Sequence, residues 1–157
     1  MPSGVHWAEW EEFEERFGNN LTRQLMITGL ELAMRQLKLA GCRTIFIDGS
    51  FASRKQKPGD FDACWEDNGV DINKLKLIAP ILYNFALRRT EQKIKYKGEF
   101  FPANYPANDS GTPYVDFFQF DTRTNKRKGI IAIDLQPTFR TPSVTNGNYL
   151  EKKGKQE

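Results

Sequence analysis

Two aspartates one residue apart, Asp60 and Asp62, are the residues whose type and spacing point most directly to chemistry. They open a short apolar run that is typical of a β-strand. Side chains alternate in a strand, so both carboxylates should leave one face while Phe61 and Ala63 leave the other. Two carboxylates on one face repel each other unless a cation lies between them. Because Mg²⁺ and Mn²⁺ prefer oxygen ligands, the pair predicts a site for a divalent metal ion.

A Gly-Ser pair, Gly49-Ser50, ends an earlier apolar run and is separated from the first aspartate by nine residues. Glycine lets a backbone approach a phosphate closely, and the serine hydroxyl can donate a hydrogen bond to it. The loop between the two motifs carries Arg54, Lys55 and Lys57, whose charges suit a triphosphate or an acidic partner. Either motif alone is common in ordinary turns. Together they predict a phosphate-binding turn joined to a metal site.

Apolar periodicity predicts the elements that position these motifs. The order of helices and strands indicates an α/β or α+β fold, a single domain with a mixed β-sheet flanked by helices and two leading N-terminal helices. Asn20 and Asp71 are expected helix caps, and Pro80 should kink or split a long helix. The expected helices span residues 5–17, 20–39 and 72–92, the expected strands span 43–48, 61–65, 94–102 and 129–135, and 114–120 is either a helical turn or a strand.

The expected domain covers residues 1–140, with leading helices over 1–41, a core over 42–136 and a flexible tail over 141–157. The chain of 157 residues has 12 Phe, 5 Tyr and 3 Trp, so it can bury a core and is not expected to be disordered. No apolar run reaches the roughly 20 residues that cross a bilayer, and no secretion signal is evident.

Two features of the composition bear on location and partners. The 2 cysteines form neither a disulfide framework nor a metal-binding spacing, which favours a reducing cytoplasm. The net charge is +3, although the first 18 residues hold five glutamates and one arginine. Basic clusters at 54–57, 126–128 and 152–155 could therefore attract a polyanion or a nucleotide.

The central motifs resemble the signature of the nucleotidyltransferase superfamily, whose best-known member is DNA polymerase β. That signature is a hydrophobic residue, Gly-Ser, a short spacer, and then Asp-hydrophobic-Asp-hydrophobic. Here it reads Ile47-Asp48-Gly49-Ser50 and Asp60-Phe61-Asp62-Ala63. The wider frame resembles uncharacterised bacterial and phage nucleotidyltransferase-like proteins, through the leading helical pair, Asp-Gly-Ser-Phe, Pro-Gly-Asp-x-Asp and a late Lys-Gly-Ile-Ile strand. This wider resemblance covers about residues 5–136.

The resemblance implies a nucleoside triphosphate bound at the Gly-Ser turn and Mg²⁺ (or Mn²⁺) held by the aspartates. The nucleotide-binding candidates are Gly49, Ser50, Arg54 and Lys57, and the catalytic and metal-binding candidates are Asp60, Asp62 and Glu99.

The family normally has a third carboxylate on a later strand. Glu99 is the first candidate because it lies on the first strand after the long helix, where the family topology places that acid. Asp134 is its rival and Asp116 is third. Asp48 is an additional acid where the family commonly has an apolar residue, and it either supports the site or leaves the sheet at its end.

The leading hypothesis is a metal-dependent nucleotidyltransferase that moves a nucleoside monophosphate from an NTP such as ATP to an acceptor hydroxyl and releases pyrophosphate. The acceptor could belong to a partner protein, an RNA or a small molecule. The alternative is a catalytically inactive module of the same fold that binds nucleotide, nucleic acid or a partner protein. A third hypothesis is a metal-dependent nuclease or a structural domain in which Asp-x-Asp is coincidental.

Overall fold

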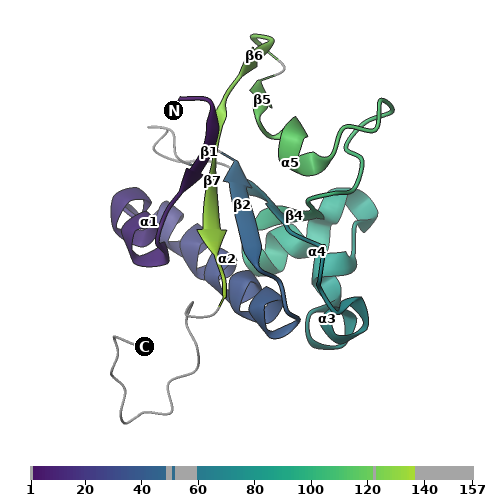
Figure 1. Ribbon diagram of the computed structural model, residues 1–157. Helices are drawn as coiled ribbons and strands as arrows, with labels where there is room; N and C mark the ends of the chain where they lie inside the picture. Colours follow the sequence, from purple (N-terminus) through teal and green to yellow (C-terminus); the bar gives the residue numbers. More distant parts are fainter. Residues whose placement is uncertain (1, 49–50, 52–59, 122, 137–157) are drawn as a thin grey trace.

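The computed structural model of the chain describes residues 2–48, 51, 60–121 and 123–136 (Figure 1). Its centre is a mixed sheet of five strands in the order β1-β7-β2-β3-β4. The two outer pairs, β1 with β7 and β3 with β4, are parallel, and β2 runs antiparallel to both of its neighbours. The strands are β1 (Gly4–Trp7), β2 (Thr44–Asp48), β3 (Phe61–Trp65), β4 (Gly98–Pro102) and β7 (Gly129–Asp134).

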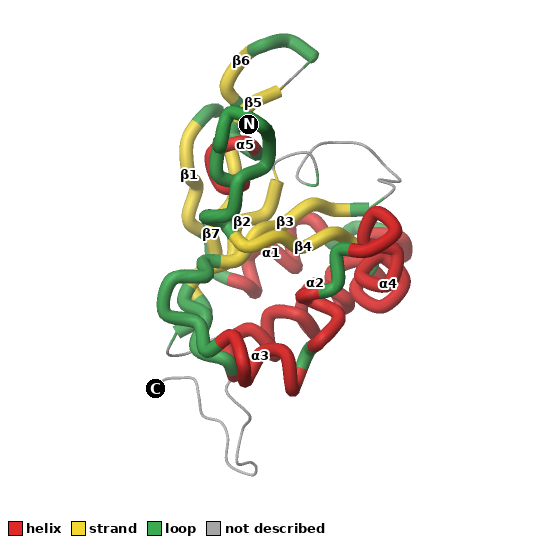
Figure 2. Tube along the Cα trace, turned by 90° about the vertical axis from the view of Figure 1, so that its right-hand side faces the viewer, coloured by secondary structure: helices red, strands yellow, loops and turns green. Residues whose placement is uncertain are grey.

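Helices gather on one side of this sheet, and the short α5 lies on the other (Figure 2). The fold is therefore α+β, as the sequence predicts. A short ribbon of β5 (Phe120–Asp121) and β6 (Lys126–Arg127) extends beyond one end of the sheet. The helices are α1 (Trp10–Phe17), α2 (Leu21–Leu39), α3 (Ile72–Ile78), the 3-10 helix η1 (Pro80–Tyr83), α4 (Ala86–Tyr96) and α5 (Tyr114–Phe117).

Two of the predicted helix caps are confirmed. The Asn20 side chain accepts a hydrogen bond from the backbone N–H of Arg23 at the start of α2, and Asp71 accepts one from Lys74 at the start of α3. Each cap satisfies a backbone donor that has no partner inside the helix. Gly29 lies where the backbone of Tyr96 reaches α2, and a Cβ there would clash with it. This glycine lets α2 and α4 pack closely.

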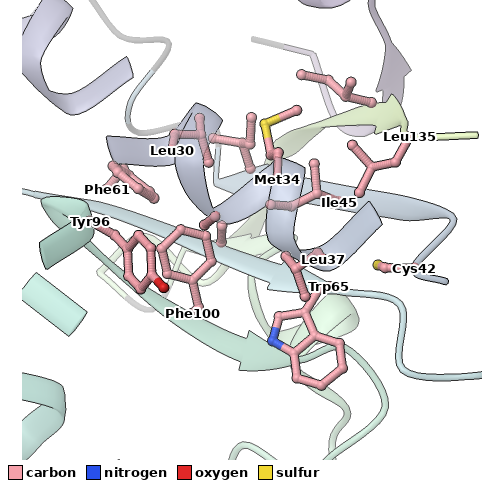
Figure 3. Close-up of a cluster of buried hydrophobic side chains, with 14 of the residues drawn as sticks. Leu30, Met34, Leu37, Cys42, Ile45, Phe61, Trp65, Tyr96, Phe100 and Leu135 are labelled. Atoms are coloured by element: carbon pink, nitrogen blue, oxygen red, sulfur yellow. The ribbon is translucent and has the colours of Figure 1, made fainter. Parts of the chain in front are cut away.

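The two faces of the sheet are covered differently. Alternate residues of the central strands, including Ile45, Ile47, Phe61 and Phe100, join a large buried cluster with α2 and the other helices. Figure 3 shows side chains from α2, β2, β3, α4 and β4 converging in this layer. The opposite face carries a smaller apolar cluster beneath α5, comprising Cys64, Phe101, Ala103, Phe118 and Ile130. The apolar character of β2 thus reflects a sheet that is covered on both faces, although unequally.

Two predicted boundaries were wrong, and the structure decides two predictions that the sequence left open. Residues 4–7 form a strand rather than the start of a helix, because they pair with β7 and alternate between inner and outer positions. The helix predicted over 72–92 is split at Pro80, as one of the two expected outcomes, into α3, η1 and α4. The strand predicted from residue 94 begins at Gly98, since α4 continues to Tyr96 and ends at Lys97 in the left-handed conformation, with φ of 66°. The ambiguous segment 114–120 forms the helix α5 before β5 begins.

Candidate functional site: a row of carboxylates across the sheet

Three carboxylates lie in one row across β2, β3 and β4. Asp62 is the direct register partner of Glu99 on the parallel strand β4. The antiparallel pairing of Ile47 with Ala63, continued by one residue, places Asp48 opposite Asp62 on the other side. Asp48 also pairs with Ile130 of β7. The row therefore crosses the end of the sheet at which β2 finishes and β3 begins.

The alternation of β3 decides which face the row occupies. Phe61, Ala63 and Trp65 are fully buried toward the helices, so Asp62 and Cys64 point to the opposite face. Gly98, the residue before Glu99, lies against the ring of Phe61, and a Cβ at this position would clash with the ring. The glycine therefore allows β4 to pack beside Phe61 and to place Glu99 in the row. The carboxylates consequently lie on the face that the long helices do not cover.

Basic side chains hold the two outer carboxylates. Asp48 is buried and lies 3.1 Å (Oδ1) from the Nζ of Lys128, which precedes β7. Glu99 Oε1 accepts a hydrogen bond of 2.6 Å from Arg89 Nε, and Glu99 Oε2 lies 3.8 Å from the Nζ of Lys93. Buried carboxylates are costly unless they are paired, and these cations meet that need at both ends of the row.

The central carboxylate, Asp62, forms no hydrogen bond or ion pair within the described parts of the chain. Its pKa is raised from 3.8 to about 7, chiefly by burial and then by the charges of Glu99, Asp48 and Asp60, while Lys128 lowers it. At neutral pH this group is therefore divided between its protonated and ionised forms. A positive charge placed beside it would stabilise the ionised form.

Asp60 precedes β3 and is exposed to solvent. Loss of water around its carboxyl raises its pKa, Glu99 raises it further, and Lys93 lowers it. Glu99 raises the pKa of both aspartates, which indicates that these three carboxyl groups share one electrostatic environment.

A left-handed turn places Arg89 beside the row. Leu87, Arg88 and Arg89 have φ of 50°, 56° and 59° within the segment otherwise counted as α4. Such backbone costs about 1–3 kcal/mol per residue outside glycine and is found most often at functional sites. The turn lays the Arg89 guanidinium 5.1 Å from the ring of Phe101 and within hydrogen-bonding distance of Glu99. The sequence contains no signal for this turn.

The structure separates the candidates for the third carboxylate. Glu99 lies beside Asp62, as the sequence interpretation favoured. Asp134 pairs with Thr44 at the other end of β2 and is exposed, and Asp116 lies on α5. The nucleotide-binding candidates Gly49, Ser50, Arg54 and Lys57 lie outside the described residues.

Sequence reasoning missed the roles of three basic residues, namely Lys128, Arg89 and Lys93. The usable signal for Lys128 was its place immediately before a buried strand that pairs with β2. The four-residue spacing of Arg89 and Lys93 indicates a shared helix face, but not which strand that face meets.

The arrangement brings acids together without forming a closed cage. Across the residues that the structure describes, no group of three or more His, Cys, Asp or Glu side chains is arranged to hold a metal ion. The outer acids are turned toward cations, and the inner one is unpaired. The carboxylate oxygens of the row are nevertheless the hard ligands that Mg²⁺ and Mn²⁺ prefer. A bound cation would also reduce the repulsion between the carboxylates.

The chain belongs to a family of unknown function, DUF6932, whose profile matches residues 1–134. The matched segment contains the whole sheet and every residue of the carboxylate row. No curated protein and no solved structure matches the chain. None of the helices within the described ranges is long and apolar enough to span a membrane.

Proposed function

We propose that this protein is a metal-dependent nucleotidyltransferase that transfers a nucleoside monophosphate from an NTP to an acceptor hydroxyl. The observation that carries the proposal is the register pairing of Asp62 with Glu99 at the end of the sheet where β2 finishes at Asp48. Gly49-Ser50 follows Asp48 directly in the sequence. The acids therefore lie at the end of the sheet from which the chain continues into the Gly-Ser motif.

In this proposal Asp60, Asp62 and Glu99 hold Mg²⁺ or Mn²⁺. The bound ion would supply a positive charge for the phosphate oxygens on which negative charge develops. Asp62 must lose its proton before it can bind the ion, because only a carboxylate is a ligand. Its pKa of about 7 allows that loss at neutral pH. Glu99 must exchange part of its contact with Arg89 for the ion.

The flanking cations contribute to the same proposal. Arg89 and Lys93 stand at one end of the row, and Lys128 stands at the other. When the carboxylates bind the metal ion, phosphate oxygens of a triphosphate would take their place beside these cations. Each cation would then keep a negatively charged partner. The acceptor would be a partner protein, an RNA or a small molecule. The two buried free cysteines support a reducing cytoplasm as its location.

A second candidate is a catalytically inactive module of the same fold that binds nucleotide, nucleic acid or a partner protein. The observation favouring it is that cations already occupy both outer carboxylates. In that case the ion pairs are permanent structural contacts, and a triphosphate would bind without a metal requirement.

Thermal unfolding with ATP, GTP, CTP and UTP, each with and without Mg²⁺, tests the proposal. A ligand at about 100 times its dissociation constant adds roughly 2.7 kcal/mol of stability. We expect a metal-dependent rise in Tm for the native chain with at least one NTP. Asp62→Asn should remove it. Asp134→Asn should keep it, because Asp134 is an exposed acid at the end of β7 that pairs with Thr44, at the end of β2 remote from Asp48.

Transfer of an α-phosphate label to protein or RNA then separates the two candidates. Labelling that requires both Mg²⁺ and Asp62 supports the enzyme. A shift in Tm that is independent of metal, with no transfer of label, supports the inactive module.

A further inference from the structure

The outer face of α2 carries a stripe of exposed leucines. Leu21, Leu25, Leu32 and Leu39 retain 71%, 53%, 39% and 56% of their accessible surface. The helix packs against the sheet with the opposite face, where Met26, Leu30, Ala33, Met34 and Leu37 are buried. In Figure 2 α2 lies on the same side of the sheet as α3 and α4, away from α5. The stripe is therefore on the side of the molecule remote from the carboxylate row.

The spacing of the stripe is that of a coiled-coil seam. Exposed positions recur alternately four and three residues apart, a mean period of 3.5 residues that keeps one line of side chains facing a partner helix. A surface helix that meets only water has no need for leucines along such a line, because each one leaves apolar area exposed. The seam positions are Leu21, Leu25, Thr28, Leu32, Arg35 and Leu39.

We propose that this seam is a homodimer interface in which α2 packs antiparallel against α2 of a second copy, with Leu32 near the two-fold axis. In this register Leu25 meets Leu39 of the second copy, and Arg35 lies near Glu31 of the second copy. The interface thus pairs leucine with leucine and a cation with an anion.

The charges along the seam favour a second copy of α2 as the partner helix and an antiparallel orientation. Arg35 occupies a seam position and already pairs with Glu31 of its own helix at 3.2 Å. A parallel pair of copies would bring Arg35 against Arg35, which is repulsive at the centre of an apolar seam. The antiparallel pair instead places two Arg35–Glu31 pairs symmetrically about Leu32, so the surface is complementary to itself, as a two-fold interface requires.

Light scattering after gel filtration, from low to high micromolar protein, tests the proposal on the full chain. The native protein should approach twice its 18.1 kDa. Leu32→Glu places like charges at the two-fold axis and should weaken the dimer by more than about a hundredfold. Leu77→Glu is the matched control, because Leu77 lies on α3 and is 84% exposed. A native protein that stays monomeric, or a dimer that Leu32→Glu leaves intact, overturns the proposal.

Engineered cysteines test the direction of the helices. Leu32→Cys should form an intermolecular disulfide, whereas Leu39→Cys should not, since antiparallel helices crossing at residue 32 hold the two copies of position 39 about 21 Å apart. The native Cys42 and Cys64 are buried, so they should not form intermolecular disulfides themselves. Equal cross-linking at both positions would indicate a parallel pair and overturn the antiparallel register. Arg35→Glu should weaken the dimer, and adding Glu31→Arg should restore it.

Discussion

The two faces of the sheet differ in how their side chains are satisfied. On the helix side, Ile45, Ile47 and Phe61 are completely buried among apolar neighbours. On the opposite side, an apolar patch beneath α5 borders the row of Asp48, Asp62 and Glu99, since Cys64 and Phe101 each lie two residues beyond an acid of the row. Burial of apolar side chains on the helix face stabilises the fold, whereas repulsion among the buried Asp48 and the partly buried Asp62 and Glu99 destabilises it. Electrostatic repulsion among acids at one end of a sheet is typical of a site that binds a cation.

The largest effect should come from the helix face. Phe100 is completely buried and its ring packs edge-on against Phe61 at 5.3 Å and Tyr96 at 5.5 Å. Phe100→Ala should lower the free energy of unfolding by about 3–5 kcal/mol, because it removes these contacts and leaves a cavity. Urea unfolding followed by circular dichroism measures the loss. A cost under 1 kcal/mol would mean that the helix face is not the stabilising one.

A substitution on the acidic face should raise the free energy of unfolding instead of lowering it. Asp62 has a pKa of about 7 in the folded protein against 3.8 ordinarily, so folding holds its proton more tightly than the unfolded chain does. Stability associated with this group is complete below pH 4 and falls as the pH rises through 7. Asp62→Asn cannot ionise, and it should therefore be more stable than the native chain at pH 8 by an amount on the order of a few kcal/mol.

The difference in Tm between Asp62→Asn and the native chain should shrink to nothing near pH 4. Calorimetry across this pH range, with Asp134→Asn as control, gives the comparison. A variant that is less stable than the native chain at pH 8 would show that Asp62 is not held against repulsion.

A smaller change in the free energy of unfolding is expected for the basic residues that pair with the carboxylate row. Arg89→Ala leaves the partly buried Glu99 with only the distant Lys93, and it should cost about 1–3 kcal/mol. Arg88→Ala is a matched control, since Arg88 has the same left-handed backbone and an exposed side chain. Both variants change the backbone preference equally, so the difference between their unfolding free energies reports the Arg89–Glu99 pair. Equal losses would show that the pair adds nothing.

The sequence predicts those parts of the fold that depend on near neighbours. A near-continuous apolar run located β2, and an apolar run opened by two aspartates located β3. Asn20 and Asp71 were recognisable as caps because a cap acts within one turn of helix. Strand β1 was missed because its partner, β7, lies at the other end of the chain, and its own four residues carry little periodic signal.

The site was predictable to the same extent. Alternation placed Asp62 on the face of β3 opposite Phe61 and Ala63. The family resemblance favoured Glu99, which is the register partner of Asp62, over Asp134. The cations were not predictable, because the contact of Arg89 with Glu99 depends on a left-handed turn that ordinary residues rarely adopt. The role of each acid in catalysis stays a prediction.

Isothermal titration with Mn²⁺ at pH 7, in two buffers of different ionisation enthalpy, tests most directly whether the carboxylate row is a metal site. Since the pKa of Asp62 is about 7, binding should release about half a proton per ion from this group, and the heat should differ between the buffers accordingly. Asp62→Asn should remove that difference, whereas Asp134→Asn should retain it. Absence of saturable binding by the native chain, or the same proton release from Asp62→Asn, would contradict the assignment of the row as a metal site.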